Sequence, residues 1–330
     1  MQPTLSPEPI MRIASGFMAA KHLFVASELG IFEALADAPA TLDALAARTG
    51  LTIRTARISA DAMVALELLE RSGQEYSNTP VAAAFLTGRS PADLRAFLTF
   101  WDQISYPAWT GLGEALATGK PPTQIFDLSD EQQAIVSAGI EAVLAGPSNA
   151  LPRAVDLSNQ RSLLDVGGGT GSWALAVARV YPGLSATVLD LPVVVEIAAG
   201  RIAGAGERAR VEAVACDVMV EDLPTGHDTF LLANLVHYWD PQENQELLSR
   251  LRAVAPAGGL LLLADFWTDA THSQPVHAAL MAGEFAVHVD HGDVYSVDEV
   301  RAWLTATGWT FVAHEPLAGP QSVIVARAGV

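Results

Sequence analysis

Residues 161–172 read Arg-Ser-Leu-Leu-Asp-Val-Gly-Gly-Gly-Thr-Gly-Ser, an apolar run that ends in an acid and three consecutive glycines. The apolar run predicts a buried strand. Glycine accepts positive φ and has no Cβ, so such a turn bends a strand into a helix and lets a ligand lie against bare backbone. The stretch therefore predicts a site for an adenosine-bearing cofactor, either a dinucleotide or S-adenosylmethionine (SAM).

The next predicted strand also ends in an acid. Asp190 lies in Val188-Leu189-Asp190-Leu191-Pro192, 23 residues after Gly167 (190 − 167). A carboxylate at this place accepts hydrogen bonds from both ribose hydroxyls of a bound nucleoside. This spacing alone suits NAD as well as SAM.

Three further residues favour SAM. Asp165, just before the glycines, carries a carboxylate that suits the cationic methionyl end of this cofactor. Asp217, in Ala215-Cys216-Asp217-Val218, follows a third predicted strand, where it is placed to read an adenine amino group. Ser172 stands where the dinucleotide pattern Gly-x-Gly-x-x-Gly has its last glycine. Glycines and acids in this order therefore predict SAM.

The composition excludes several classes of protein. The chain has 330 residues, 50% of them hydrophobic and 17% charged, enough to bury a large core in two domains. Its formal net charge of -18 opposes nucleic-acid binding, which depends on Lys and Arg contacts to phosphates. The single cysteine, Cys216, fits a reducing compartment. Without a signal-peptide pattern or an uninterrupted apolar run of membrane-spanning length, we expect a cytoplasmic protein that binds neither nucleic acid nor membrane.

Three regions are predicted along the chain. Residues 1–105 form a mainly α winged-helix dimerisation domain, residues 106–155 a helical linker and substrate lid, and residues 156–330 a Rossmann-like α/β catalytic domain. Five aromatic rings lie near the first boundary: Phe97, Phe100, Trp101, Tyr106 and Trp109. Any single ring is explained by ordinary helix packing, but the group is placed to enclose a small, partly apolar substrate.

Within the first region, the pattern is typical of a winged helix. Thr41 is predicted to cap a helix over 42–48 that Gly50 ends. A second helix over 53–71 places four apolar residues inward: Ile58, Met63, Leu66 and Leu69. A β wing follows over 75–79. Because the chain is acidic, dimerisation is favoured over DNA recognition.

Strands and helices alternate from residue 162 onward, as in a doubly wound sheet. The predicted strands are 162–166, 186–190, 211–215, 228–234, 259–265, 309–313 and 322–326, the last two as an antiparallel pair. Ligands of such sheets bind outside the carboxyl ends of the strands. Five residues fall at those ends: Gly167, Asp190, Asp217, His237 and Asp265.

A histidine and an acid follow two neighbouring predicted strands. His237 comes after the fourth strand and Asp265 closes the fifth. A carboxylate beside an imidazole fixes its tautomer and stabilises the imidazolium, which makes the histidine an effective general base. The alternative is a structural histidine at the strand end.

These residues resemble the class I SAM-dependent methyltransferases, specifically the O-methyltransferase family of caffeate and hydroxyindole O-methyltransferases and bacterial antibiotic-pathway relatives. Four motifs match in order over nearly the whole chain: the loop 165–171, the triplet Asp190-Leu191-Pro192, Asp217, and His237-x-Trp239-Asp240.

The resemblance implies a homodimeric enzyme that methylates an oxygen of a small, aromatic metabolite. It implies that His237 is the general base and Asp265 its orienting acid. The cofactor-binding residues are then Asp165, Gly167, Gly169, Asp190, Leu191, Asp217, Val218 and Trp239.

The chain departs from the family pattern at two positions where the family usually has an acid near the base. Tyr238 stands where the family commonly has Asp, and His291-Gly292-Asp293 stands where it often has a glutamate. Nearby are His288 and His291, and either of them together with His237 suggests a site for a divalent or ferric ion. Such an ion would assist carbon methylation of an α-keto acid such as an arylpyruvate. The alternative is that His288 and His291 are solvated loop residues.

Functions from other classes remain open at this point. A methyltransferase-like fold that binds the cofactor without methyl transfer differs in the mass of its product. A DNA-binding regulator is disfavoured by the charge of the chain. An NAD oxidoreductase would show nicotinamide-dependent absorbance changes, which we do not expect.

Overall fold

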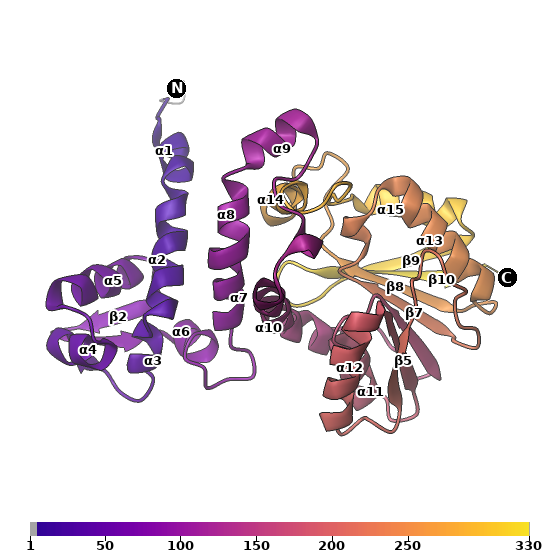
Figure 1. Ribbon diagram of the computed structural model, residues 1–330, viewed down its shortest axis with the longest axis horizontal. Coiled ribbons are helices and arrows are strands. Elements are labelled where there is room, and N and C mark those ends of the chain that lie inside the picture. The colour runs from indigo at the N-terminus through magenta and orange to yellow at the C-terminus, as the bar shows by residue number, and fades with distance from the viewer. Residues whose placement is uncertain (1–4, 330) are drawn as a thin grey trace. The chain divides into compact units, whose positions relative to one another are not determined.

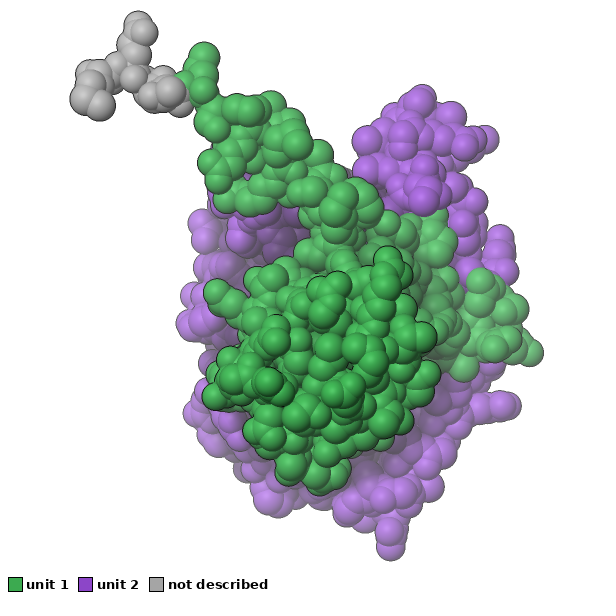
Figure 2. All heavy atoms as spheres, turned by 90° about the vertical axis from the view of Figure 1, so that its left-hand side faces the viewer, with its two compact units in different colours: residues 1–107, 129–143 green, residues 108–128, 144–330 purple. Residues whose placement is uncertain are grey.

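The structure, a computed structural model, describes residues 5–329 of the chain (Figure 1). Two compact units are formed (Figure 2). The first contains residues 1–107 and 129–143, and the second contains residues 108–128 and 144–330. Neither unit is one continuous run of chain, so the predicted division at residues 105 and 155 stays a prediction.

The first unit is mainly helical around a small antiparallel sheet with the strand order β1-β3-β2. Its helices are α1 (Glu8–Ala14), α2 (Gly16–Glu28), α3 (Ile31–Ala34), α4 (Leu42–Thr49), α5 (Ile53–Ala65), α6 (Pro80–Phe85) and α7 (Arg95–Phe100), followed by the π-helical turn Trp101–Ser105. Its strands are β1 (Ala40–Thr41), β2 (Leu69–Ser72) and β3 (Glu75–Asn78). The core of this unit includes Phe32, Leu45, Met63 and Tyr76, all fully buried.

The winged-helix pattern is correct for α4 and for the start of α5, with Met63 and Leu69 buried as predicted, but it is wrong for the end of α5. Thr41 caps α4 by accepting a hydrogen bond from the Ala44 amide at 3.4 Å, and Gly50 ends it at φ 69°. The second helix ends at Ala65 instead of residue 71. Glu67 takes a left-handed conformation (φ 60°), and Leu69–Ser72 then pairs with β3. Ile58 and Leu66, predicted to point inward, are 38% and 39% exposed.

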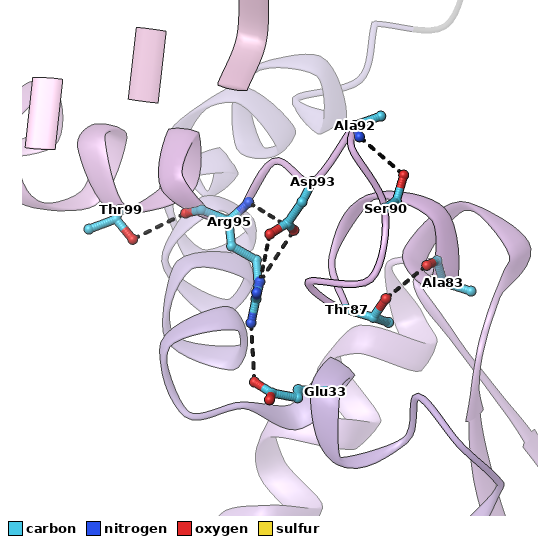
Figure 3. Close-up of polar contacts among 8 residues, drawn as sticks. All are labelled: Glu33, Ala83, Thr87, Ser90, Ala92, Asp93, Arg95 and Thr99. Carbon is cyan, nitrogen blue, oxygen red and sulfur yellow. Dashed lines mark hydrogen bonds and ion pairs between the residues drawn. The ribbon is translucent and has the colours of Figure 1, made fainter. Parts of the chain in front are cut away.

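An arginine fastens the start of α7 to α3 (Figure 3). The Arg95 Nε donates to both carboxylate oxygens of Asp93 at 3.2 and 3.0 Å, and its Nη1 donates to Glu33 at 3.1 Å. Gly88 passes so close that a Cβ there would lie 1.9 Å from the Arg95 Nη2. The loop before α7 is therefore fitted around this guanidinium.

The second unit confirms the predicted seven-stranded sheet. Its strand order is β6-β5-β4-β7-β8-β10-β9, with the first five strands parallel and the last two antiparallel. The strands are β4 (Ser162–Val166), β5 (Ser185–Asp190), β6 (Val211–Ala215), β7 (Thr229–Ala233), β8 (Leu260–Asp265), β9 (Trp309–Pro316) and β10 (Ser322–Ala328). β10 is the last strand in the sequence, yet it lies between β8 and β9 and is therefore an inner strand of the sheet.

Helices cover both faces of this sheet (Figure 1). α13 (Pro241–Val254) and α15 (Val297–Ala306) pack on one face, through residues such as Leu247 and Trp303. α11 (Ser172–Val180) and α12 (Pro192–Gly204) pack on the other, together with the end of α10 (Asp130–Ala154). Because both faces are covered, the central strand β7 is buried at every residue, whereas the edge strand β6 is partly exposed.

The remaining elements of the second unit lie near the carboxyl ends of its strands or precede the sheet in sequence. They are α9 (Leu112–Thr118), the 3-10 turns Ile125–Asp127 and Val236–Tyr238, and α14 (Val276–Ala286). α8 (Tyr106–Trp109) contains the boundary between the units. α9 packs on α14 through Ala115 and Val287. Segment 108–128 is thus attached to the catalytic half of the chain.

α10 is the single helix within residues 5–329 that is long and apolar enough to cross a membrane by length and composition. The sequence analysis did not single it out. Residues 130–143 of this helix belong to the first unit and residues 144–154 to the second, and the helix contains Pro147 and Pro152. Length and composition alone do not separate a membrane span from a helix of a soluble protein.

Candidate functional site

The glycine loop between β4 and α11 leaves no space for a side chain at Gly167 or Gly168. Gly167 and Gly169 have φ of 62° and 56°, a region that L side chains rarely adopt. A Cβ on Gly167 would lie 2.7 Å from the Leu235 Cδ1, and one on Gly168 would lie 2.7 Å from the Asp165 Cγ. The loop is therefore a surface of bare backbone at the carboxyl edge of the sheet, as predicted.

Asp190 lies beside this loop at the end of β5. One carboxylate oxygen accepts a hydrogen bond from the Gly169 amide at 2.8 Å, and the other accepts from the Leu191 amide at 2.8 Å. Burial raises the pKa of Asp190, against the lowering effect of these two amides. The side chain is half-buried, and Leu191 is 47% exposed. The geometry places an acceptor-rich carboxylate against the glycine loop.

Asp217 and Val218 follow β6, the next strand along this edge. The Cys216 amide donates to the Asp190 carbonyl at 2.9 Å, which ties the two strand ends together. The Asp217 carboxylate accepts from the Met219 amide at 3.0 Å, and Val218 is 8% exposed. The structure thus brings Gly167, Asp190 and Asp217 into one row.

The Asp165 carboxyl group lies against the glycine loop, where a Cβ on Gly168 would meet it. Its side chain is 0% exposed. The Oδ2 atom accepts a hydrogen bond from the Ala174 amide, in the first turn of α11, at 3.1 Å, while the buried Oδ1 has no hydrogen-bond partner. α11 has no side-chain cap of its own, so Asp165 serves as one from below the loop. Contact between Asp165 and the cofactor stays a prediction.

Burial raises the pKa of Asp165 from 3.8 to about 7. The folded protein therefore holds a proton that the unfolded chain releases near pH 4, so this carboxyl lowers the stability of the fold as pH rises from 4 through 7. Asp165→Asn keeps the acceptor for Ala174 and removes the ionisation. We expect the melting temperature of the variant, relative to wild type, to increase between pH 5 and pH 8 in thermal melts. A difference that is the same at both pH values would contradict this.

His237 and Asp265 form a buried pair at the ends of β7 and β8. The His237 Nδ1 lies 2.8 Å from the Asp265 Oδ1 and 3.0 Å from its Oδ2. The two residues are 6% and 1% exposed. Both contacts use Nδ1, which leaves Nε2 free of hydrogen bonds within residues 5–329. The predicted pairing of these two residues is thus present in the structure, and it fixes the proton on Nδ1.

Aromatic rings hold the imidazole on two sides. The Phe285 ring of α14 stacks on His237, with centroids 4.1 Å apart and an interplanar angle of 15°. The Tyr238 ring lies 4.5 Å from the imidazole, tilted by 52°. The backbone of His237 is also closely packed, because a Cβ on Gly292 would lie 2.4 Å from its carbonyl oxygen.

The sequence analysis missed Phe285 and its neighbour Glu284. Glu284 is 6% exposed and accepts a hydrogen bond from the Trp109 Nε1 at 2.5 Å. The pKa of Tyr238 is raised to about 12, mainly by burial. The charges of Asp265, Glu284 and Asp190 raise it further. A signal was present in the sequence, since Glu284 is the single acid in the apolar helix Val276–Ala286.

Trp239 and Asp240 lie directly before α13 and stabilise its first turn and the packing around it. Trp239 packs partly buried against the core, and Asp240 forms a capping box with Glu243. The buried side chain of Asn244 donates to the carbonyls of Val236 and Trp239 at 2.9 and 3.0 Å. These bonds fix the turn that carries His237.

The three histidines of the predicted metal site have different surroundings. His288 is 3% exposed and its Nε2 lies 3.3 Å from the Glu284 Oε1, whereas His291 is exposed. Within the described part of the chain, no three His, Cys, Asp or Glu side chains are grouped so as to hold a metal ion. The residues present therefore do not fit the predicted ion, and the metal-assisted reaction gains no support from this arrangement.

Two family domains account for most of the chain. Residues 11–88 match the O-methyltransferase dimerisation domain and residues 109–310 match the O-methyltransferase domain. The first match agrees with the choice of dimerisation over DNA recognition for the winged-helix pattern.

Individual relatives agree with these matches. The chain is 34% identical to the 3-hydroxy-5-methyl-1-naphthoate 3-O-methyltransferase of Streptomyces sahachiroi, over 95% of this chain and 92% of that protein. It is 30% identical to the tetracenomycin polyketide synthesis 8-O-methyl transferase TcmO of Streptomyces glaucescens, over 97% and 96%. Its fold is similar to the crystal structure of human N-acetylserotonin methyltransferase in complex with SAM, with a TM-score of 0.88 and 25% identity over 100% of both chains. The chain therefore belongs to the O-methyltransferase family, as the motifs of its sequence predicted.

Proposed function

We propose that the protein transfers the methyl group of SAM to a hydroxyl oxygen of a small aromatic metabolite, with His237 as the general base. The observation that carries this proposal is the buried His237–Asp265 pair, whose free Nε2 lies at the same sheet edge as the glycine loop and Asp190. A histidine held in this way at the edge where α/β sheets bind ligands is suited to take a proton from a substrate.

The residues at the edge fit SAM. The glycine loop offers backbone where a Cβ would clash, and Asp190 offers carboxylate oxygens for the ribose hydroxyls. Asp217 and Val218 are suited to the adenine, next to Leu191, Gly169 and Trp239. When bound, SAM supplies an electrophilic methyl group on a cationic sulfur.

Proton transfer to His237 is the step that this chain's own residues perform. A phenol of pKa about 10 and a histidine of about 6.5 differ by roughly 3.5 units, or about 5 kcal/mol in water. Asp265 accepts the Nδ1 hydrogen of His237 and so stabilises the imidazolium that forms in this step. The O–H proton goes to Nε2, the oxygen forms the new O–CH₃ bond, and the S–CH₃ bond breaks with its electron pair left on sulfur. One proton is released to solvent when His237 is reset.

The protein is further proposed to act as a homodimer in the cytoplasm. Residues 11–88, which match the dimerisation domain, support the dimer. α1 has no buried residue within the single chain, and Ile10, Met11 and Ile13 are each more than 60% exposed. Contiguous exposed apolar surface of this kind is typical of an interface.

Methyl transfer is tested with SAM labelled by ¹³C in its methyl group and 2,3-dihydroxynaphthalene as the acceptor. We expect SAM to bind in calorimetry and the product to gain one labelled methyl, with the O–CH₃ carbon identified by NMR. A product labelled at carbon would favour carbon methylation. Binding of SAM with no labelled product from any hydroxyarene would favour a fold that has lost methyl transfer.

A further inference from the structure

A second polar pair lies one residue from the ring that supports the base. Glu284 and His288 are 6% and 3% exposed, and the Glu284 Oε1 lies 3.3 Å from the His288 Nε2. The other carboxylate oxygen accepts the Trp109 indole hydrogen at 2.5 Å. The catalytic step proposed above uses neither side chain.

This pair lies close to His237. Phe285, the residue after Glu284, stacks on the His237 ring. Tyr238, the residue after His237, lies in the electric field of Glu284, which contributes to its raised pKa. Tyr238 and Phe285 also contact each other, with ring centroids 6.5 Å apart. Glu284 is therefore linked to both aromatic side chains that contact the base, Phe285 by sequence and Tyr238 by its charge.

His288 has unsatisfied hydrogen-bonding capacity. Neither ring nitrogen makes a hydrogen bond, and both are buried. A buried donor or acceptor without a partner costs about 1–3 kcal/mol, so such groups in native proteins usually have a partner that is a ligand, a water or an ion. We consider a substrate bound at His237 as this partner, because Phe285 and Tyr238 connect the two sites.

The neighbouring carboxylate determines which kind of group His288 takes. Because Glu284 lies beside Nε2, it favours the tautomer with the proton on that nitrogen. Nδ1 is then an acceptor, and the group that it binds has to be a hydrogen-bond donor. A hydroxyl or an amino group meets this requirement, whereas a carboxylate, which only accepts, does not.

The charges of the surrounding segments act in the same direction. There is no lysine or arginine between Arg210 and Arg250, or between Arg252 and Arg301. These stretches contain the loops after β6, β7 and β8 and the whole of α14. Glu284 and Asp265 are buried acids within these stretches, so their charges disfavour a substrate anion bound near them.

We propose that Glu284 and His288 form a specificity subsite that selects aromatic substrates with a hydroxyl or amino group next to the methylated hydroxyl, and that rejects a carboxylate there. This inference rests on the proposed function. It differs from what the name of the Streptomyces sahachiroi relative states, since that relative acts on a naphthoate.

Three probes with one ring system test the subsite: 2-naphthol, 2,3-dihydroxynaphthalene and 3-hydroxy-2-naphthoate. Their dissociation constants are measured by calorimetry on the full chain with saturating S-adenosylhomocysteine, so no turnover is needed. We expect the diol to bind about 2- to 12-fold more tightly than 2-naphthol, as one net hydrogen bond provides. The naphthoate should bind most weakly.

Two variants assign these differences to the subsite. His288→Phe should reduce the advantage of the diol over 2-naphthol to about twofold or less, since its ring has no acceptor. Glu284→Gln, which keeps an acceptor for Trp109, should bring the naphthoate closer to 2-naphthol. His314→Phe, on the exposed strand β9, is the matched control and should leave all three ratios unchanged.

Each contrary outcome has a separate meaning. Wild-type protein that binds the naphthoate as tightly as the diol would overturn the subsite, as would a diol advantage that persists in His288→Phe. Binding of S-adenosylhomocysteine without binding of any probe would also overturn it, while the cofactor assignment stands. Failure of S-adenosylhomocysteine itself to bind would instead remove the proposed function.

Discussion

We expect His237→Ala to lower kcat for methyl transfer by about 10²- to 10⁴-fold, the usual contribution of a positioned general base. The dissociation constant of SAM should change little, because His237 has its contacts with Asp265, Phe285 and Tyr238 and belongs to the turn after β7. The measurement is steady-state kinetics with a hydroxyarene acceptor, alongside calorimetry with SAM.

A conservative variant of Asp265 separates a base from a merely structural histidine. Asp265→Asn should retain the fold and SAM binding but lose activity, because the amide favours the wrong tautomer of the imidazole. His314→Ala is the matched control, since that histidine is exposed on β9. A loss of less than about tenfold in His237→Ala would exclude the role of general base.

The second large effect is expected for Asp190→Ala, which should weaken SAM binding by about 10²- to 10⁴-fold. Two ribose hydroxyls lose a charged acceptor, and each such hydrogen bond contributes about 1.5–3 kcal/mol. The Gly169 amide also loses the partner that holds the glycine loop, at 2.8 Å in the structure. The measurement is calorimetric titration of the purified variant with SAM and with S-adenosylhomocysteine.

A matched control removes the same charge at the same edge of the sheet. Asp222 is exposed in the loop after β6, so Asp222→Asn should leave the affinity for SAM unchanged. If Asp190→Ala and Asp222→Asn lowered the affinity equally, the effect would be one of overall charge, and the ribose contact would be wrong. Near-wild-type affinity in Asp190→Ala would lead to the same conclusion.

Strands such as β5 and β8 could be predicted from sequence because each is an apolar run closed by an acid. β4 and β6 begin and end at the predicted residues, and Asp190 and Asp265 end β5 and β8. In a parallel sheet the carboxyl ends share one edge, so locating the strands also located the acids of the site. The helix over residues 53–71 failed for the opposite reason. Its apolar spacing continues past Ala65. However, Glu67 takes a left-handed backbone conformation, and Leu69–Ser72 then forms a strand that pairs with β3.

The second polar pair could not be predicted because its contacts are tertiary. Trp109 and Glu284 are 175 residues apart in sequence and meet only through the packing of segment 108–128 on α14. Asp165 shows the same limit. Its place before the glycines suggested a ligand contact, whereas its full burial and its bond to the Ala174 amide are properties of the folded chain.

The inner position of β10 has a consequence for how the protein is made. Ser322 pairs with Asp265, so the acid that orients His237 acquires its strand neighbour 57 residues later in the chain (322 − 265). During synthesis on the ribosome, β8 is an open edge of the nascent sheet until β10 has left the exit tunnel. Long-range pairings of this kind form slowly and leave unpaired backbone exposed in the meantime. The sheet is therefore completed last at β8, the strand that ends in Asp265, and until then the backbone of this strand stays unpaired on one side.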